Sequence, residues 1–415
     1  MYNCIKSASI ARRVLTGLLI AFICFSTAAC HKADMFVNKP LPEDIAGTDD
    51  GSGEGTDIVP EGGEVEESPL PTDDNERDVS KDIKAKALYL TGWTVGIPER
   101  AQHFIELANN TEINSYVIDI KDDDGYVGYK SDIQAVKDIG AWKSKYDADK
   151  VIKEFKDNDI YIIGRLVCFK DPILSSKKTE LAVKNINGGV WRDNNSFTWL
   201  DPYNRDSWDY IIDIAREAVS KGFDEIQFDY IRFPNDGNSK AMKFLSSDLK
   251  RYEVINEFIS YAKKELPGVP LSADVFGIIL ESPEDTERIG QYLEFIGKEI
   301  DCISPMVYPS HYAVGQKVNG VQYMKPDLDP YGVVYNSLVK AKDRISLVED
   351  YNAKVRPYLQ NFTASWLGKD YYQTYGEEQV KQQIKAVYDA GYEEWIFWSP
   401  NNKYAESAFE KETRE

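Results

Sequence analysis

The chain has 415 residues, enough for one large domain or two ordinary ones. It is acidic, with 69 Asp and Glu against 49 Lys and Arg and a formal net charge of −20 at pH 7. This balance argues against a duplex nucleic-acid binder, which needs a basic face to neutralise phosphates. The acidity is uneven, because residues 31–82 hold 16 Asp and Glu against 4 Lys and Arg. The excess charge is therefore mostly a property of that segment.

The first thirty residues have the pattern of an export signal. Residues 1–13 carry basic side chains and no acid, and the apolar run VLTGLLIAFICF (14–25) follows. That run is too short to span a bilayer, and small residues separate it from Cys30. The end of the segment resembles a bacterial lipoprotein signal, which implies removal of residues 1–29 and lipidation of Cys30. Such signals usually carry Leu where Thr27 stands, so ordinary signal-peptidase cleavage nearby or an uncleaved anchor stays open.

Residues 30–82 are rich in Gly, Pro, Asp, Glu, Ser and Thr. Such a composition cannot bury enough apolar surface to offset the entropy of ordering, so we expect a disordered acidic linker. Together with the signal, it predicts a protein that is exported and lipid-anchored to the outer face of the bacterial cell membrane. The folded domain is expected to occupy residues 83–415. Cys168 and Cys302 fall in predicted strands, where buried free thiols are expected rather than a disulfide framework.

From residue 86 onward, short apolar strands alternate with amphipathic helical segments. The predicted strands are 86–93, 115–121, 160–169, 224–233, 270–277, 301–309, 355–362 and 393–400. The predicted helices include 98–110, 147–159, 207–222, 248–266, 285–299 and 377–391. Eight strand–helix units in about 330 residues predict an α/β fold, a (β/α)8 TIM barrel. An open doubly wound sheet is the alternative, which the absence of a Gly-rich first strand–helix turn disfavours.

Two connections are long enough to be insertions. Residues 171–206 follow the third predicted strand, and residues 310–330 follow the sixth. Both leave the carboxyl ends of strands, the face on which barrel active sites are built. We therefore expect them to wall a cleft.

Polar residues interrupt the apolar pattern late in several strands. In FDEIQFDYIRFP (223–234), Gln227 and Asp229 share one face, because alternate side chains of a strand point the same way. A carboxylate on a buried face is costly unless it is paired or used. The strand ends meet at one barrel mouth, so these polar residues are expected to form a site there. The residues that we expect to bind substrate are Asp119, Lys121, Arg165, Gln227, Arg232, Tyr308, Gln360 and Trp398.

The residue types limit the chemistry of this mouth. No G-x-S-x-G sequence offers a nucleophilic serine, and His31, His103 and His311 lack the spacing of a metal site. We therefore expect neither a metal nor a cofactor. Carboxylates and aromatic rings are abundant, which is typical of glycoside hydrolysis, where two carboxylates act on a sugar held against aromatic faces. Two or three aromatics are expected to line the cleft, Tyr308 and Trp398 first.

Four stretches, ALYLTGW, SYVIDIKDDDG, FDEIQFDYIRFP and LSADVFG, resemble the bacterial "putative glycosyl hydrolase domain" family. The resemblance covers roughly residues 86–400 and implies a TIM barrel related to retaining glycosidases. It places Asp229 at the nucleophile position. Relatives take the acid/base residue from the end of strand six, where this chain reads SPMVYPSHY and has no carboxylate. That departure leaves Asp274 as the acid/base candidate, with Glu281 as a fallback.

The geometry of neighbouring strands is compatible with a reacting pair. Strands lie about 4.8 Å apart, so Asp229 and Asp274 could approach the ~5–5.5 Å of retaining enzymes, and so close a pair would keep one carboxyl protonated near neutral pH. Alternatively, Asp229 could be a structural ion-pair partner of Arg165 or Arg232, and Asp274 could merely orient Asp229.

The sequence thus predicts an exported, membrane-tethered glycoside hydrolase acting on a polysaccharide or cell-wall glycan. A non-catalytic carbohydrate-binding lipoprotein with the same barrel is the alternative. A barrel isomerase or aldolase is a third possibility, although Lys121 is the one lysine placed to form a Schiff base.

Overall fold

The computed structural model describes residues 83–411. The predicted export signal, Cys30 and the acidic linker lie outside the described residues. Within residues 83–411, no helix combines the length and apolar character needed to cross a bilayer.

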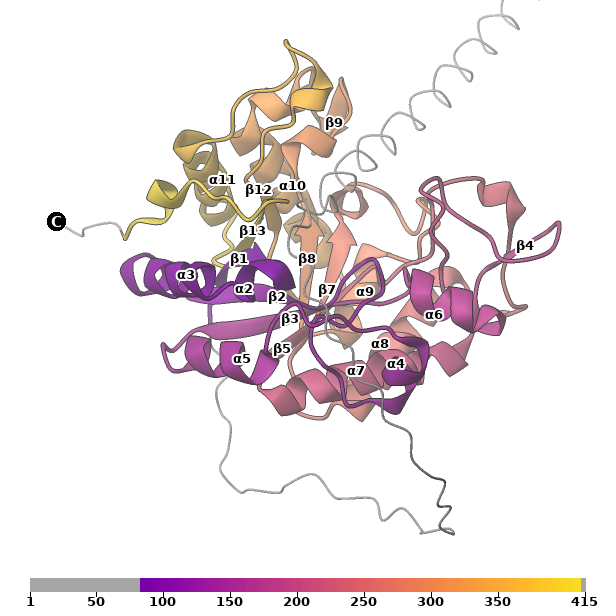
Figure 1. The fold of residues 1–415 in the computed structure, drawn as a ribbon. Coiled ribbons are helices and arrows are strands. Elements are labelled where there is room, and N and C mark those ends of the chain that lie inside the picture. Colours follow the sequence, from indigo (N-terminus) through magenta and orange to yellow (C-terminus); the bar gives the residue numbers. More distant parts are fainter. Residues whose placement is uncertain (1–82, 412–415) are drawn as a thin grey trace, which may run out of the picture.

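Eight parallel strand positions close into a barrel (Figure 1). The strands are β1 (Lys86–Leu90), β2 (Ser115–Lys121), β3 (Tyr161–Val167), β5 (Glu225–Asp229), β7 (Leu271–Phe276), β8 (Cys302–Met306), β12 (Tyr358–Gln360) and β13 (Trp395–Trp398). β1 pairs with both β2 and β13, and β7 pairs with β8, so the sheet has no free edge. The predicted (β/α)8 barrel is confirmed.

The seventh strand position is split into two pieces. β11 (Lys354–Val355) pairs with β8, and β12 pairs mainly with β13. Pro357 stands in the gap, and proline has no N–H to give to the ladder. The continuous strand predicted over 355–362 is therefore interrupted.

Several other strands also end earlier than predicted, and the first and fourth do so for a clear local reason. The first ends at Leu90, because Thr91 caps the short helix α2 (Gly92–Val95), in which Trp93 is exposed. The fourth ends at Asp229, because Tyr230 adopts a left-handed backbone with φ 48°. Side chains after these points no longer follow strand alternation.

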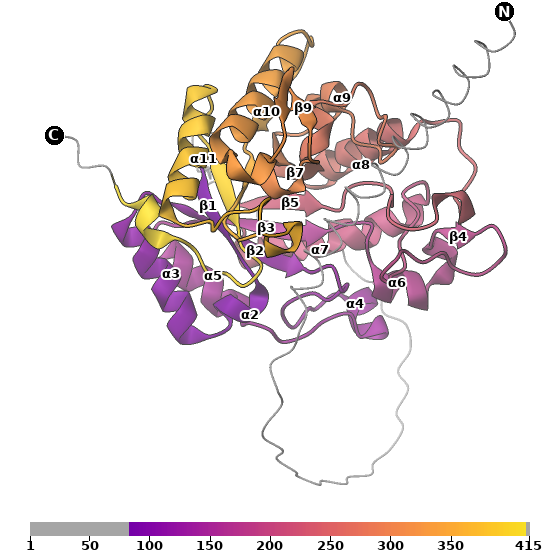
Figure 2. The same cartoon turned by 90° about the horizontal axis from the view of Figure 1, so that it is seen from above.

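Helices surround the barrel and cover the outer faces of its strands (Figure 2). They are α3 (Pro98–Asn110), α5 (Ala148–Lys156), α7 (Trp208–Lys221), α8 (Arg251–Glu265), α9 (Leu293–Glu299), α10 (Pro330–Ile345) and α11 (Glu377–Asp389), whereas α4 (Gln134–Ile139) and α6 (Pro172–Lys177) lie in the connections after β2 and β3. α9 is shorter than the predicted helix over 285–299. The Asp285 carboxylate accepts hydrogen bonds from the N–H groups of Ile289 and Gly290, which holds that stretch as a loop.

Both predicted insertions are present as small structured excursions from the barrel. Residues 171–206 contain α6 and β4 (Lys184–Asn185), which pairs with β6 (Met242–Lys243) from the connection after β5. Residues 310–330 contain the hairpin of β9 (Gln316–Val318) and β10 (Val321–Tyr323). In Figure 1, β4 and β9 project on different sides of the barrel.

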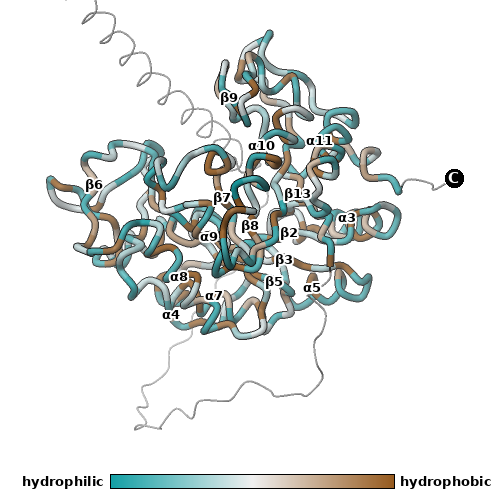
Figure 3. Tube along the Cα trace, turned by 180° about the vertical axis from the view of Figure 1, so that it is seen from behind, coloured by the Kyte–Doolittle hydropathy of each residue, from teal (hydrophilic) through white to brown (hydrophobic). Residues whose placement is uncertain are grey.

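The apolar core lies between the strands and the helices. Outward side chains such as Ile118, Leu166, Phe228 and Phe397 are fully buried there. In Figure 3, hydrophobic segments accordingly concentrate around the strands, while outer loops are largely hydrophilic. The barrel interior, in contrast, is lined by many polar side chains.

The two ends of the described chain lie close together at the amino-terminal ends of the strands, here called the base. The Lys86 ammonium pairs with Glu112 at 2.6 Å, and the Glu112 N–H donates to the Phe409 carbonyl. Glu410 forms a bridge to Thr111 just before β2.

Candidate active site

Strand β5 places three polar side chains on the inner face of the barrel. Glu225, Gln227 and Asp229 alternate with Ile226 and Phe228, which lie in the outer core. The period-two pattern of a strand therefore carries polar groups from the base to the mouth of the barrel.

The lower groups form an ion network that is buried at the base. Arg356 donates to both carboxylate oxygens of Glu225, at 3.0 and 3.1 Å, and to Glu394 at 2.9 Å. Above this base network (Glu225, Arg356 and Glu394), the Gln227 amide donates to Ser304 and accepts from Tyr358. These layers fill the barrel interior and close it below the mouth.

At the mouth, Asp229 is held by two kinds of donor. Arg165 on β3 donates to its Oδ2 from Nε at 2.8 Å and lies 2.6 Å away through Nη2. The backbone N–H of Tyr230 donates to Oδ1 at 2.6 Å, which the left-handed conformation of Tyr230 permits. Charge-assisted donors of this kind stabilise the carboxylate form.

Arg165 joins Asp229 to further carboxylates. Its Nη1 donates to Asp119 at 2.7 Å, and its Nη2 lies 3.7 Å from Asp123. Tyr89 donates to the other oxygen of Asp119 at 2.7 Å. Burial raises the pKa of Asp119 despite the Arg165 charge. For Asp123, burial also opposes ionisation, but the charges of Lys170 and Arg165 outweigh it and hold the pKa below its usual value.

Asp274 has the opposite surroundings. Asp274 lies on β7. The pairing of β5 with β7 ends at Phe228 and Ala273, and Asp229 and Asp274 are the next residues of these two strands. The Asp274 side chain is 3% exposed, and its Oδ1 has no hydrogen-bond partner. Burial, followed by the charge of Asp229, raises the pKa of Asp274 well above the ordinary value of an aspartate. The two carboxyl groups thus differ in surroundings, since Asp229 is hydrogen-bonded through both oxygens and burial favours the neutral form of Asp274.

Aromatic side chains form one side of the mouth, here called the aromatic wall (Tyr308, Phe362, Trp366 and Trp398). Tyr308 stacks on Trp398, with ring centroids 5.9 Å apart, and Phe362 stacks on Trp366 at 5.9 Å. Phe362 meets Trp398 edge to face at 5.2 Å, so the four rings are continuous. Tyr308 follows β8, which pairs with the Asp274-bearing β7, and burial and the charges of Asp274 and Asp229 raise the pKa of Tyr308.

Residues 87–404 match the family described as "Putative glycosyl hydrolase domain". The chain belongs to this glycosyl hydrolase domain family. The match covers nearly the whole barrel, from β1 to the segment after β13.

The chain is similar to two solved structures, and the first of them shows the same fold. The PgaB (BpsB) glycoside hydrolase domain from Bordetella bronchiseptica aligns with a TM-score of 0.56 and 13% identity, over 79% of this chain and 99% of that chain. A hypothetical protein from Ruminiclostridium thermocellum ATCC 27405 is 69% identical over 45% of this chain and 97% of that chain, with a TM-score of 0.44. No curated protein sequence matches.

Four of the residues that the sequence predicted to bind substrate contact other residues of the protein instead. Lys121 is fully buried and pairs with the equally buried Asp171 at 2.6 Å, because a register shift after Asp119 turns it away from the mouth. Gln227 is fully buried in the layer below. Gln360, also fully buried, accepts from the Ser310 N–H and donates to Asp327. These positions correct the expectation of direct substrate contact.

Arg232, the fourth, is enclosed by rings. Its guanidinium lies 4.4 Å from the ring centre of Phe276, 5.0 Å from that of Trp199 and 5.1 Å from that of Tyr230. It is 6% exposed, so it contacts protein on most sides. Trp199 and Trp191 are each 1% exposed and offer no face to a glycan.

The remaining predicted residues do converge. Asp119, Arg165, Asp229, Asp274, Tyr308 and Trp398 lie together at the mouth. Arg165 is occupied by carboxylates, so its role there is to hold them. Glu281 instead accepts a hydrogen bond from the Asn319 N–H in the β9–β10 turn, which directs it toward that hairpin.

Sequence reasoning missed three members of the mouth. Tyr89 follows Ala85 and Ala87 on the inner face of β1, so strand alternation could have identified it. Asp123 lies in the turn after β2, in which Gly125 has a left-handed backbone with φ 88°, and its approach to Arg165 joins strands distant in sequence. Lys170 approaches Asp123 at 3.4 Å and the Tyr230 hydroxyl at 3.3 Å, and no pattern in the sequence signals this contact.

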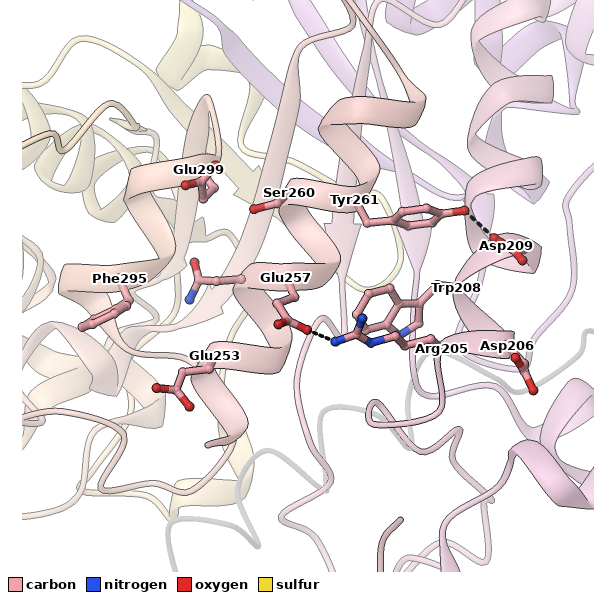
Figure 4. Close-up of a pocket in the computed structure, with 11 residues that line it drawn as sticks. Arg205, Asp206, Trp208, Asp209, Glu253, Glu257, Ser260, Tyr261, Phe295 and Glu299 are labelled. Atoms are coloured by element: carbon pink, nitrogen blue, oxygen red, sulfur yellow. Dashed lines mark hydrogen bonds and ion pairs between the residues drawn. The ribbon is translucent and has the colours of Figure 1, made fainter. Parts of the chain in front are cut away.

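Two further features of residues 83–411 concern sites outside the mouth. No group of three or more His, Cys, Asp or Glu side chains is placed to hold a metal ion in that range. A groove of about 660 Å³ lies outside the barrel between α7, α8 and α9, lined mainly by acidic and aromatic side chains (Figure 4). Its acids include Glu257, which pairs with Arg205, and Asp209, which accepts from Tyr261.

Proposed function

We propose that this protein is an exported, membrane-tethered glycoside hydrolase that cleaves a polysaccharide or cell-wall glycan with Asp229 and Asp274. The observation that carries the proposal is the contrast between the two carboxyl groups. Asp229 is surrounded by donors that favour its charge, whereas Asp274 is buried with one oxygen unpartnered. Two carboxyl groups with divergent environments at one mouth supply an acid and a nucleophile.

In the proposed first step, Asp274 gives its proton to the glycosidic oxygen as the bond to the anomeric carbon breaks. The Asp229 carboxylate forms a bond to that carbon from the opposite face. In the second step, Asp274 takes a proton from water, the water oxygen bonds to the anomeric carbon, and Asp229 is released. Arg165 holds the Asp229 carboxylate in position before the attack.

The placement of the pair on adjacent strands supports retention of configuration. Adjacent strands are about 4.8 Å apart, whereas an inverting pair needs roughly 6.5–9.5 Å to admit a water. Trp366 and Trp398, the partly exposed members of the aromatic wall, provide ring faces for stacking of sugar units.

Export and tethering are supported by the sequence alone. The apolar run of residues 14–25 and Cys30 support a lipid anchor, and residues 30–82 would form the tether. A flexible chain of that length has a root-mean-square reach of about 40 Å. This reach would let a barrel at the membrane act on surrounding polymer.

The test is a screen of the full chain, purified in detergent, against nitrophenyl glycosides and bacterial and plant polysaccharides. We expect turnover that Asp229→Ala and Asp274→Ala each abolish, and NMR of the first product should show the anomer of the substrate. Net inversion would contradict the retaining mechanism. Glycan binding without turnover by the parent would instead favour the non-catalytic carbohydrate-binding lipoprotein.

A further inference from the structure

Gln291 lies in the connection between β7 and α9, and it is 1% exposed. Its Nε2 donates to the carbonyl oxygen of Asp274 at 3.1 Å and to that of Ile231 at 3.4 Å. Its Oε1 accepts from the N–H of Phe276 at 2.9 Å. The side-chain amide of Gln291 therefore makes three hydrogen bonds, all of them with backbone groups.

These contacts join the ends of β5 and β7 at a level where the two strands are not paired through their backbones. The pairing of β5 with β7 stops at Phe228 and Ala273, one residue before Asp229 and Asp274. Beyond that point, Gln291 connects the backbone of Asp274 to Ile231, two residues after Asp229. Gln291 thus links β5 to β7 beyond the point at which their backbone hydrogen bonding ends.

Arg232 connects the same two strand ends through its side chain. It follows Ile231, and its guanidinium lies over the ring of Phe276, the last residue of β7, at 4.4 Å. The N–H of Phe233 also donates to the carbonyl of Ile289, two residues before Gln291, at 2.7 Å. The segment that carries Gln291 is therefore fixed against the loop after β5 by a second contact.

We propose that Gln291, supported by Arg232, is a positioning residue that sets the separation and orientation of Asp229 and Asp274. The proposal rests on the proposed function, because it assigns Gln291 to the same carboxyl pair. Gln291 touches the backbone of both strand ends and has no contact with the reacting oxygens. Loss of its amide should let the ends of β5 and β7 move apart, and small displacements at a reacting centre cost large factors in rate.

The chain offers a matched control. Gln383 on α11 is also fully buried, and it accepts from the Gln360 N–H at 3.0 Å and donates to the carbonyls of Gln360 and Gln379 at 2.8 and 3.1 Å. It fixes the end of β12 as Gln291 fixes the end of β7. Gln291→Met and Gln383→Met each remove three comparable hydrogen bonds, but one of them does so beside the carboxyl pair.

Both full-length variants are compared with the parent by melting temperature, by 13C NMR titration of labelled aspartate carboxyl groups, and by kcat and KM on a cleaved glycoside. Melting temperature should fall similarly in both. Only Gln291→Met should lower the titration midpoint of Asp274, because a more distant Asp229 opposes its ionisation less. In that variant alone kcat should fall by roughly 10²-fold with little change in KM, and the basic limb of the pH profile should move to lower pH.

The outcomes separate the positioning role from the proposed function. A lower midpoint in Gln291→Met, with a parent that cleaves no glycan, supports the positioning role and counts against the hydrolase. An unchanged or higher midpoint, or equal effects in both glutamine variants, overturns the positioning role. If Gln291→Met does not fold, Phe276→Leu at a half-buried position weakens the Arg232 contact, and the same shift in midpoint is required of it.

Discussion

Asp229 and Asp274 carry the same carboxyl group in unlike surroundings. Asp229 accepts hydrogen bonds from Arg165 and from the Tyr230 backbone, whereas Asp274 Oδ1 has no partner. An unpartnered buried carboxyl is destabilised most in its charged form, so burial favours the neutral form of Asp274 and makes its ionisation costly in stability. Such a cost is typical of residues whose chemistry the protein uses.

This contrast predicts opposite effects of Asp274→Asn on activity and stability. Activity should fall by about 10²–10⁴-fold, because asparagine cannot donate the proton. The raised pKa of Asp274 means that its stabilising effect is fully present below the ordinary aspartate value and is lost as pH rises through the folded-state pKa. Asparagine does not ionise, so the variant should unfold at higher urea concentration than the parent in alkaline buffer.

Urea unfolding of the parent and Asp274→Asn from about pH 4 to about pH 9 checks this prediction. The stability difference in favour of asparagine should shrink toward acid pH. A constant difference across the range would mean that Asp274 binds its proton equally in the folded and unfolded states, so that folding does not raise its pKa.

For single residues, strand alternation predicted which side chains point inward, but it did not predict their ion-pair and hydrogen-bond partners. Asp229 and Asp274 were found because a polar residue at every second position of a strand shares a face. That Arg165 is bound to Asp119 and Asp229, rather than open to substrate, depends on contacts between strands distant in sequence. A single strand pattern contains no information about such contacts.

The ends of strands are where the prediction of whole elements fails. The strand predicted over 224–233 stops at Asp229, and a register shift between Asp119 and Lys121 reverses the direction expected for Lys121. A one-residue shift moves a side chain to the other face. Neither the left-handed Tyr230 nor the shift after Asp119 follows from residue type, since tyrosine rarely adopts positive φ.

Tyr230 allows a test of this strand end. Tyr230→Asn and Tyr230→Val both remove the ring that contacts Lys170, so they differ mainly in backbone preference. Asparagine tolerates the left-handed region, whereas a β-branched residue is strongly disfavoured there. Tyr230→Val should therefore be less stable than Tyr230→Asn by about 1–2 kcal/mol in urea unfolding. Equal stabilities would show that the φ of residue 230 relaxes in the variants.

For the molecule as a whole, the count of strand–helix units predicted the closed barrel correctly. What the count could not predict is the interior filling, because the base network joins residues 225, 356 and 394 across the barrel. The β4–β6 pairing also depends on two segments that meet only in the folded chain. Long-range pairs of this kind determine how the barrel is sealed below its mouth.

The base network should contribute strongly to global stability. Arg356→Met leaves the buried Glu225 without its cation and leaves Glu394 with Lys354 alone, which should lower the free energy of unfolding by about 3–5 kcal/mol. Arg205→Met, which breaks a surface pair with Glu257, should cost about 0–1 kcal/mol. Chemical denaturation of both variants checks the difference, and a loss in Arg356→Met as small as that in Arg205→Met would contradict it.

The nearness of residues 86 and 409 at the base has a practical consequence. A bead, a fluorescent protein or a host chain that is joined to the first or last residue of the barrel domain is attached at the base, on the side away from Asp229 and Asp274. The domain can thus be immobilised, or inserted into a surface loop of a carrier protein, with the mouth of the barrel left accessible to large polymers.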